Sequence, residues 1–389
     1  MADARQATSQ ALAEHAPRVS ILVPSYNHAR YIGKALDSAL AQDFADFELL
    51  ISDDASRDNS WEAICSFADP RIRRFRQPRN LGPVGNLVFL IGQARGEYVA
   101  LLNSDDAWYP AKLGKQVQVL NADPQLAACF TWAALVDAEG RPVAGPEAVW
   151  KDVFRQPNRS QAEWLRHFFT SGNCLCHPSM LMRRELYQTL GFYNPGLKQL
   201  PDFEMWVRLL KRHPIHIIQQ DLVAHLRDGS NTSAVSAENT ARNLTELVEI
   251  FAGFFSGMPD ELFVEAFASR FRRADLAGRP GHLLCEQLFL LFDCSFAQAP
   301  ARAAALSAFM RHLADPQVEQ LLRDEYGFSV FDYYRLTGTS GFGHLLLASS
   351  TAAAPAGAPV LAGDARSRAF AQHLLRRARG LARRFVRLF

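Results

Sequence analysis

Short apolar runs alternate with helical patterns over the first hundred residues, and this alternation is the feature that most restricts the fold of the chain. The runs have the length of strands, whereas the segments between them repeat their apolar residues every three or four positions. Such an alternation predicts a parallel sheet with helices on its faces. The expected strands are residues 19–24, 47–52, 71–77 and 97–102, and the expected helices are residues 29–42, 61–67 and 84–95.

Polar residues stand at the exits of three of these strands. Tyr26 follows the first strand, Asp53-Asp54 end the second, and Asp105-Asp106 follow the run that starts at Glu97. Ligands of parallel sheets bind where the carboxyl ends of the strands meet their loops. We therefore expect these side chains to line one site.

The neighbouring carboxylates of Asp105 and Asp106 allow two interpretations. At the mouth of a sheet they repel each other and are partly desolvated, so a divalent cation, Mg2+ or Mn2+, would keep both ionised and hold the phosphates of a nucleotide. Alternatively, they cap a helix that begins near Pro110, because Asp is a favoured N-cap and Pro a favoured first helical residue. No glycine-rich phosphate loop follows the first strand, and this favours the metal.

The composition is that of an ordinary globular protein. Of the 389 residues, 48% are hydrophobic and 21% are charged. No apolar run reaches the roughly 20 residues that span a bilayer. The first 17 residues lack the apolar segment of a secretory signal, so we expect a cytoplasmic protein. The six cysteines include no CxxC pair, and Cys174-Leu175-Cys176-His177 lacks the spacing of a zinc knuckle, so we expect buried thiols.

Several motifs occur in one order along the chain. They are residues 19–27, the segment 47–58 with its Asp-Asp-x-Ser-x-Asp ending, Asn80-x-Gly82, Gly96-Glu97-Tyr98 and Asn103-Ser104-Asp105-Asp106. Together they resemble the family-2 glycosyltransferases, which have the GT-A fold, and the resemblance covers residues 18–233. It implies an α/β architecture with a Rossmann-like, mixed and mostly parallel sheet flanked by helices.

The resemblance also implies roles on the donor side. Tyr26 would stack on uracil and Asp54 would accept the ring N–H of the base. Asp105 would contact ribose or act in the outer shell of the ion, and Asp106 would ligate the divalent metal. The implied site residues are Pro24, Tyr26, Asp54, Asn86 and Asp105 for the nucleotide and Asp106 for the metal.

Asp202 is the expected catalytic base. It stands at the start of a helical pattern over residues 201–209, and it aligns with the acidic motif that supplies the base in the family that the chain resembles. A sugar hydroxyl is a poor nucleophile until a positioned carboxylate takes its proton. The alternatives are that Asp202 is an N-cap, and that Glu204, a lesser candidate for the base, is a first-turn acid that favours the helix dipole.

Residues 225–233 resemble the loop that closes over the donor phosphates in relatives. Many relatives carry a histidine near the position of Asp228, so the chain departs from them there, and roles for His225 and Arg227 stay open. The Gln-x-x-Arg-Trp motif of processive members is absent, which predicts one sugar per encounter.

The C-terminal part divides into three segments. Residues 236–348 continue in a helical pattern, and we expect an appendage that packs on the catalytic domain or pairs with a second subunit as a homo-oligomer. Residues 349–363 are rich in alanine and proline, which predicts a linker. Residues 364–389 hold eight arginines in an amphipathic pattern, typical of a helix in the headgroup region of an anionic membrane. The alternatives are a solvated helix or one docked on protein or RNA; because the rest of the chain is net acidic, we favour the membrane and expect no nucleic acid.

These patterns predict a flexible tail over residues 1–17, a GT-A domain over 18–235, the helical appendage, the linker and the amphipathic helix. The predicted function is inverting, metal-dependent transfer of one sugar from a UDP- or dTDP-linked donor to a saccharide or lipid-linked saccharide. It would serve cell-surface polysaccharide or lipopolysaccharide synthesis at the inner face of the membrane. The alternatives are a membrane-docked nucleotide-sugar-binding scaffold, and a nucleotidyl-sugar pyrophosphorylase, which would need a glycine- and lysine-rich loop where residues 25–28 stand.

Overall fold

The computed structural model describes residues 16–144, 150, 152–228 and 236–339. The predicted linker (349–363) and amphipathic helix (364–389) lie outside these residues, as do most of the predicted N-terminal tail and residues 229–233 of the segment 225–233 that resembles the loop over the donor phosphates. Within the described part of the chain, no helix combines the length and apolar character that a membrane crossing requires.

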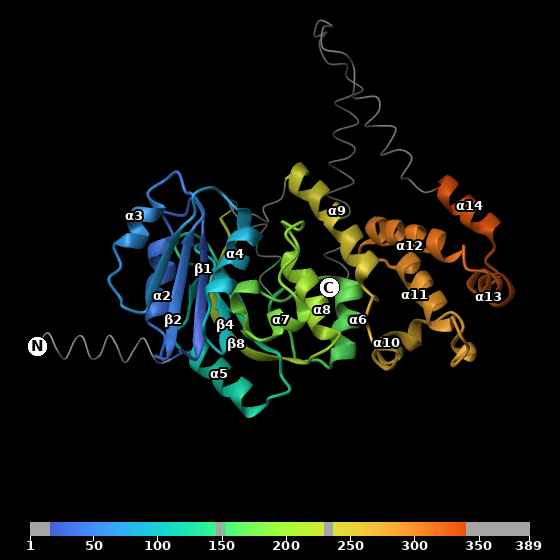
Figure 1. The fold of residues 1–389 in the computed structure, drawn as a ribbon, viewed down its shortest axis with the longest axis horizontal. Coiled ribbons are helices and arrows are strands. Elements are labelled where there is room, and N and C mark those ends of the chain that lie inside the picture. Colours follow the sequence, from blue (N-terminus) through green and yellow to red (C-terminus); the bar gives the residue numbers. More distant parts are fainter. Residues whose placement is uncertain (1–15, 145–149, 151, 229–235, 340–389) are drawn as a thin grey trace, which may run out of the picture. The chain divides into compact units, whose positions relative to one another are not determined.

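The described residues form one mixed sheet of eight strands (Figure 1). The strands are β1 (Val19–Ser25), β2 (Phe47–Asp53), β3 (Ile72–Arg76), β4 (Tyr98–Leu101), β5 (Ala107–Trp108), β6 (Ala128–Val136), β7 (Leu181–Arg183) and β8 (Ile215–Leu226). Their order across the sheet is β3-β2-β1-β4-β7-β6-β8-β5. β1 pairs in parallel with β2 and β4, and β2 with β3, so the carboxyl ends of these four strands lie along one edge. β7 is antiparallel to both of its neighbours, β4 and β6. This arrangement confirms the predicted α/β class with a mixed sheet.

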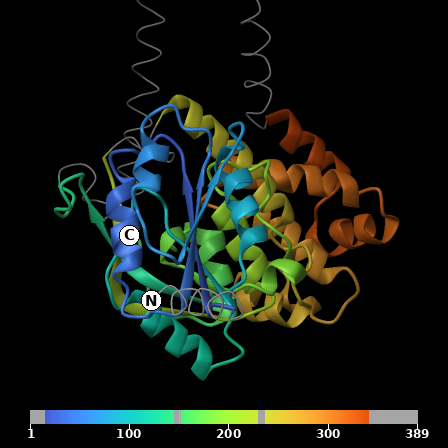
Figure 2. The same ribbon diagram turned by 60° about the vertical axis from the view of Figure 1, so that its left-hand side comes forward.

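Alternate side chains of the central strands point into two separate cores. In β1, Ile21 and Val23 face one core and Leu22 faces the other. Helices α2 (Ile32–Leu40) and α5 (Lys112–Ala122) cover the first face, and α4 (Gly82–Gln93), α6 (Gln161–Ser171) and α8 (Pro201–Leu210) cover the second. Figure 2 shows helices on either side of the blue strands. Because both faces are buried, the strands read as continuous apolar runs rather than as alternating ones.

The remaining elements of this part are short. They are α3 (Ser60–Cys65), the 3-10 turn η2 (His177–Ser179) and α7 (Leu186–Leu190). The helix expected from residue 29 begins only at Ile32, because the chain first makes a turn in which Asn27 has a left-handed φ of 53°. The helix expected from residue 84 begins earlier, at Gly82, where the carboxylate of Asp54 accepts hydrogen bonds from the first backbone N–H groups.

The region after residue 236 is helical, as predicted, throughout its described part. It contains α9 (Ala237–Gly253), α10 (Asp260–Phe267), α11 (His282–Asp293), α12 (Gln298–His312), α13 (Pro316–Tyr326) and α14 (Val330–Thr339), with 3-10 turns η3 (Ala268–Arg270) and η4 (Ala274–Leu276). The buried apolar side chains of this region up to Tyr333 belong to the same continuous core as the second face of the sheet.

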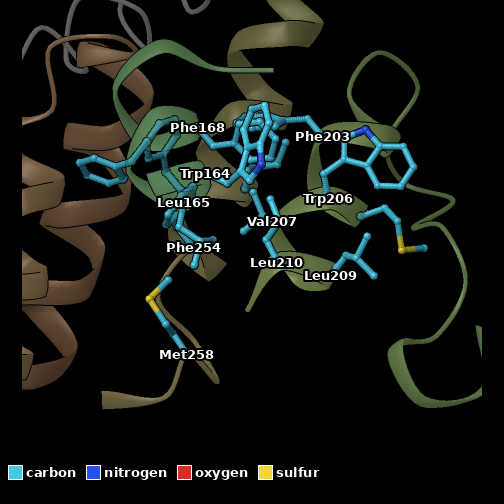
Figure 3. Close-up of a cluster of buried hydrophobic side chains, with 14 of the residues drawn as sticks. Trp164, Leu165, Phe168, Phe203, Trp206, Val207, Leu209, Leu210, Phe254 and Met258 are labelled. Atoms are coloured by element: carbon cyan, nitrogen blue, oxygen red, sulfur yellow. The ribbon is translucent and has the colours of Figure 1, made fainter. Parts of the chain in front are cut away.

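Aromatic side chains join this helical region to α6 and α8. Phe169 of α6 meets the rings of Phe251, Phe254, Phe255 and Phe267 at centroid distances of 5.2–5.5 Å. Figure 3 shows Phe254 and Met258 of the helical region beside the buried side chains of α6 and α8. The side of α6 that carries Phe169 is therefore covered by the helical region.

Candidate functional site

A pocket of about 590 Å³ lies at the carboxyl ends of β1, β2 and β4. Six of the seven predicted site residues line it, namely Pro24, Tyr26, Asp54, Asn86, Asp105 and Asp202. The seventh, Asp106, is buried next to Asp105 and is not part of the described pocket wall. The fold thus brings together side chains from turns that are far apart in the sequence.

The loops after β1 and β2 form one edge of this pocket and are bonded to each other. Two non-glycine residues in them, Asn27 and Ala55, have left-handed φ values of 53° and 59°. The bonds are Asn27 N to Ser56 Oγ (2.9 Å), Arg57 N to Asn27 Oδ1 (2.8 Å) and Ala29 N to Asp58 Oδ2 (3.0 Å). Tyr26 stands in this edge with 39% of its surface exposed, so its ring is open to a flat ligand.

Asp54 and Asn86 lie at the start of α4. Asp54 Oδ1 accepts from Leu81 N (2.7 Å) and Oδ2 from Gly82 N (3.0 Å); burial raises the pKa of Asp54, and these two bonds oppose the rise. Asn86 Nδ2 donates to Ser52 O (3.0 Å), while its Oδ1 is buried without a hydrogen-bond partner among the described residues. A buried acceptor of this kind in a pocket wall is suited to a ligand N–H.

Asp106 is tied into the protein by three hydrogen bonds. Its Oδ1 accepts from His225 Nδ1 (2.9 Å) and Leu226 N (2.8 Å), and its Oδ2 from Asn103 Nδ2 (3.0 Å). When Nδ1 of a histidine donates to a carboxylate, its Nε2 carries the lone pair that can bind a metal. His225 itself lines the pocket.

Asp105 lies in the pocket wall beside this pair. Burial, and then the charge of Asp106, raise the pKa of Asp105 above its usual value. Neither aspartate caps a helix, because α5 begins at Lys112 after Ala111 and has no side-chain cap. The capping interpretation is therefore wrong. In the described part of the chain, no three His, Cys, Asp or Glu side chains are grouped as a metal site. Asp105 and His225 are two groups of this wall, beside Asp106, that could hold a cation.

Asp202 is half-buried at the first turn of α8 and lines the pocket. Asn173 Nδ2 donates to its Oδ2 (2.8 Å), and Phe203 N donates to its Oδ1 (2.8 Å). Burial raises the pKa of Asp202 to about 6. The N-cap position of α8 is Leu200, so the interpretation of Asp202 as an N-cap is wrong.

Glu204 is engaged elsewhere on the same helix. Its Oε2 accepts from Arg208 Nη2 at 2.8 Å, one turn further along α8. It is absent from the described wall of the pocket. The ion pair gives Glu204 a structural role, as a first-turn acid paired with a residue of the last turn.

Other pocket residues were missed by the sequence analysis. Two are histidines: His28 Nδ1 lies 2.7 Å from Ser104 Oγ, and His177 Nε2 lies 2.9 Å from Tyr193 Oη. Burial lowers the pKa of both, and that of His177 to about 3, so His177 is neutral near pH 7. The further residues are Lys198, Gln199 and Asn239. For His177 the sequence offered one signal, its position next to Cys176. That signal suggests a metal motif and does not predict a place in the pocket wall.

Comparison with known proteins places the similarity in the sheet domain. Residues 20–191 match the model of the family described as glycosyl transferase family 2. An uncharacterized glycosyltransferase of Rickettsia felis is 31% identical over 224 residues, which are 56% of this chain and 36% of that protein. One of Rickettsia prowazekii is 27% identical over 255 residues, 64% of this chain and 74% of that protein. The chondroitin synthase of Pasteurella multocida is 28% identical over 229 residues, 58% of this chain and 22% of that protein. The chain thus spans little more than a third of the Rickettsia felis relative.

Two solved structures have a similar fold. Residues 1–349 of S. aureus TarS in complex with UDP superpose with a TM-score of 0.54 and 17% identity, covering 89% of this chain and 95% of that 1–349 chain. The mannosyltransferase PcManGT of Pyrobaculum calidifontis, in complex with GDP-Man and Mn2+, superposes with a TM-score of 0.50 and 20% identity, covering 87% of each chain. These likenesses confirm the predicted GT-A type of fold.

Proposed function

We propose that this chain is a family-2 glycosyltransferase that moves one sugar from a nucleotide-diphosphate sugar to a hydroxyl of a saccharide or lipid-linked saccharide. The observation that carries the proposal is the convergence of Tyr26, Asn86 and Asp105 with the half-buried carboxylate of Asp202 in one pocket. The match of residues 20–191 to the family model supports it. Similarity to a chondroitin synthase and to a succinoglycan biosynthesis protein supports a polysaccharide product.

The chemistry we propose is a single displacement with inversion. Asp202 takes the proton of the acceptor hydroxyl, whose oxygen attacks the anomeric carbon as the nucleotide diphosphate leaves from the opposite face. Asn173 holds the carboxylate in place, and the raised pKa of Asp202 makes it a stronger base than an exposed aspartate. Burial keeps His177 neutral near pH 7, so His177 lines the pocket without contributing a charge.

The donor edge fits a base with a ring N–H beside a carbonyl, a group that uracil and thymine present and that guanine also carries. The exposed ring of Tyr26 provides a stacking surface, and the unpartnered Asn86 Oδ1 provides an acceptor for the N–H. Asp54 already accepts two backbone hydrogen bonds, so we assign the base N–H to Asn86 before Asp54. Together with the resemblance to family-2 glycosyltransferases, this supports UDP and dTDP sugars as the proposed donors.

A divalent cation, Mg2+ or Mn2+, fits the wall around Asp105. We propose Asp105 and His225 as its protein ligands, with Asp106 orienting His225, in place of the predicted ligation by Asp106. Such sites commonly use one or two protein ligands together with phosphate oxygens and water. When bound, the cation would neutralise charge on the leaving diphosphate. The raised pKa of Asp105 supports this fit, because a neighbouring cation would favour its ionised form.

A thermal-shift screen tests this function. Nucleotide sugars are added singly to the full chain, with and without Mn2+. A ligand at about 100 times its dissociation constant stabilises the folded state by about 2.7 kcal/mol. We expect UDP or dTDP sugars to raise the melting temperature in the presence of Mn2+, and donor hydrolysis to follow. Binding without turnover, with or without a saccharide acceptor, would instead support a scaffold.

We also propose that residues 364–389 hold the protein on the inner face of an anionic membrane. The support is their sequence alone. Apolar residues recur there every three or four positions, and eight arginines occupy other positions of the same pattern. Sedimentation with vesicles of phosphatidylglycerol and phosphatidylcholine tests this. The full chain should sediment with them at low salt, and a chain ending at residue 363 should not.

A further inference from the structure

A carboxylate of the helical region holds the loop that leads into the helix of Asp202. Glu246 lies in α9 and only 5% of its surface is exposed. Its Oε1 accepts from Lys198 N (2.8 Å) and Gln199 N (3.1 Å), and its Oε2 from Gln199 N (2.8 Å) and Leu200 N (2.8 Å). Three successive backbone N–H groups thus converge on one buried carboxylate.

These N–H groups are the ones that precede α8. The first N–H groups of a helix lack partners within the helix, and a negative charge beside them is stabilised by the helix dipole. Leu200, at the N-cap, has no side chain that could accept a hydrogen bond. Glu246 accepts from the N–H of Leu200 and from those of the two residues before it, although it lies on another helix, 46 residues further along the chain than Leu200. Asp202 lies two residues after this segment.

The same segment faces the pocket. Lys198 and Gln199 line it, and so does Asn239 of α9. Gln199 Nε2 donates to Asn239 Oδ1 at 3.0 Å, which joins the loop to the first turn of α9 a second time. The wall around Asp202 is therefore built from both α8 and α9.

We propose that Glu246 is a positioning residue for Asp202, so that α9 is part of the active site. This inference rests on the proposed function, because Asp202 is the base there. Loss of the Glu246 carboxylate would release residues 198–200 and let the start of α8 shift. A misplacement of about 1 Å can reduce a rate by about a hundredfold.

The test compares Glu246→Gln with Glu249→Gln in the full chain. Glu249 is exposed on the same helix, so its variant makes the same change of charge without touching the loop. In Glu246→Gln, the amide nitrogen would place a donor against backbone N–H groups of residues 198–200 and remove their hydrogen bonds to one of the two oxygens. Hydrolysis of UDP-GlcNAc or UDP-glucose in Mn2+ is measured per UDP-binding site, together with the affinity for UDP and the amide exchange of residues 198–200.

We expect Glu246→Gln to lower kcat at least about tenfold with the KM for the donor and the affinity for UDP unchanged. Amide exchange at residues 198–200 should speed up at least about tenfold, with no change in β1. Glu249→Gln should match the wild type in all readouts. A purely structural role would lower the melting temperature while kcat per binding site stayed at the wild-type value, and that result would overturn the inference. Unchanged exchange at residues 198–200 would overturn it too. A wild-type chain that neither binds nor hydrolyses nucleotide sugars would instead refute the proposed function, and the exchange experiment would still decide whether Glu246 holds the loop.

Discussion

At the scale of single residues, the site depends on carboxylates whose surroundings differ. Asp202 is half-buried and has a raised pKa, Asp106 is buried and accepts three hydrogen bonds, and Glu204 is paired with Arg208. Of these three, only Asp202 both lines the pocket and has a pKa raised to about 6. The surroundings, rather than the residue type, therefore separate the candidate base from the structural acids.

Asp202→Asn should abolish transfer while leaving donor binding intact. A general base contributes about 10² to 10⁴ in rate, so we expect turnover to fall at least about a hundredfold. The affinity for UDP should change little, because Asp202 lies on a different element from Tyr26 and Asn86. Initial rates with the best donor, and calorimetry with UDP, measure the two effects. Glu204→Gln is the matched control, and equal losses in both variants would contradict the assignment.

The raised pKa of Asp202 also predicts two effects of pH, one on turnover and one on the stability of the folded state. Turnover should fall as the pH drops through about 6, because the base becomes protonated. A carboxyl group whose pKa is raised on folding, here from 3.8 to about 6, destabilises the folded state once it is ionised. Asp202→Asn should therefore melt at a higher temperature than the wild type above about pH 6, with the difference shrinking between pH 6 and 3.8. Calorimetric melting across this range measures it, and a pH-independent difference would speak against the pKa shift.

At the scale of elements, the sequence was sufficient where the signal was local. The apolar runs of β1, β2 and β4 and their polar exits could be predicted, because strands buried on both faces are continuous and their ends share an edge. Helix starts were less accurate, since the left-handed turn at Asn27 and the cap from Asp54 involve residues of other segments. His177 and Asn239 could not be predicted as pocket residues, because only folding brings them to the pocket. The bonds of Glu246 likewise join segments nearly fifty residues apart.

The C-terminus of α6 shows how closely the elements are fitted. Gly172 ends this helix with φ 85° and ψ −165°, a conformation that favours glycine, and an added Cβ would collide with the ring of Phe296. We expect Gly172→Ala to lower the free energy of unfolding by about 2–4 kcal/mol. Because Asn173 follows directly, turnover should fall as well. Urea unfolding measures the stability. Gly92→Ala, at an exposed helical position with open space, should be neutral or stabilising, and a similar loss there would contradict the explanation.

At the scale of the whole molecule, the helical region and the sheet domain share one core. The ring cluster around Phe169 and the hydrogen bonds from residues 198–200 to Glu246 both cross the boundary predicted near residue 235. The region named an appendage from its sequence is thus bound to the sheet domain by apolar and polar contacts. Its removal would expose the aromatic surface of α6.

A chain that ends at residue 235 should therefore fail to fold as a soluble monomer. Exposed apolar patches of this kind lead to association. We expect aggregation or a loss of cooperative melting, as measured by size-exclusion chromatography and circular dichroism. A chain that ends at residue 339 keeps the shared core and should melt like the full chain. If the chain of 235 residues melts cooperatively and binds UDP, the sheet domain folds without the helical region, and the prediction is wrong.

The mutual bonds between the loops after β1 and β2 have a consequence for recognition. Asn27, Ser56 and Asp58 fasten this edge through hydrogen bonds between protein atoms alone. A nucleotide would bind to an edge that is already ordered, so the two loops would lose little conformational entropy on binding. Calorimetry of UDP binding should therefore show only a small unfavourable entropy. Ser56→Ala removes the hydrogen bond from Asn27 N and should make this entropy more unfavourable, while the binding enthalpy stays nearly the same.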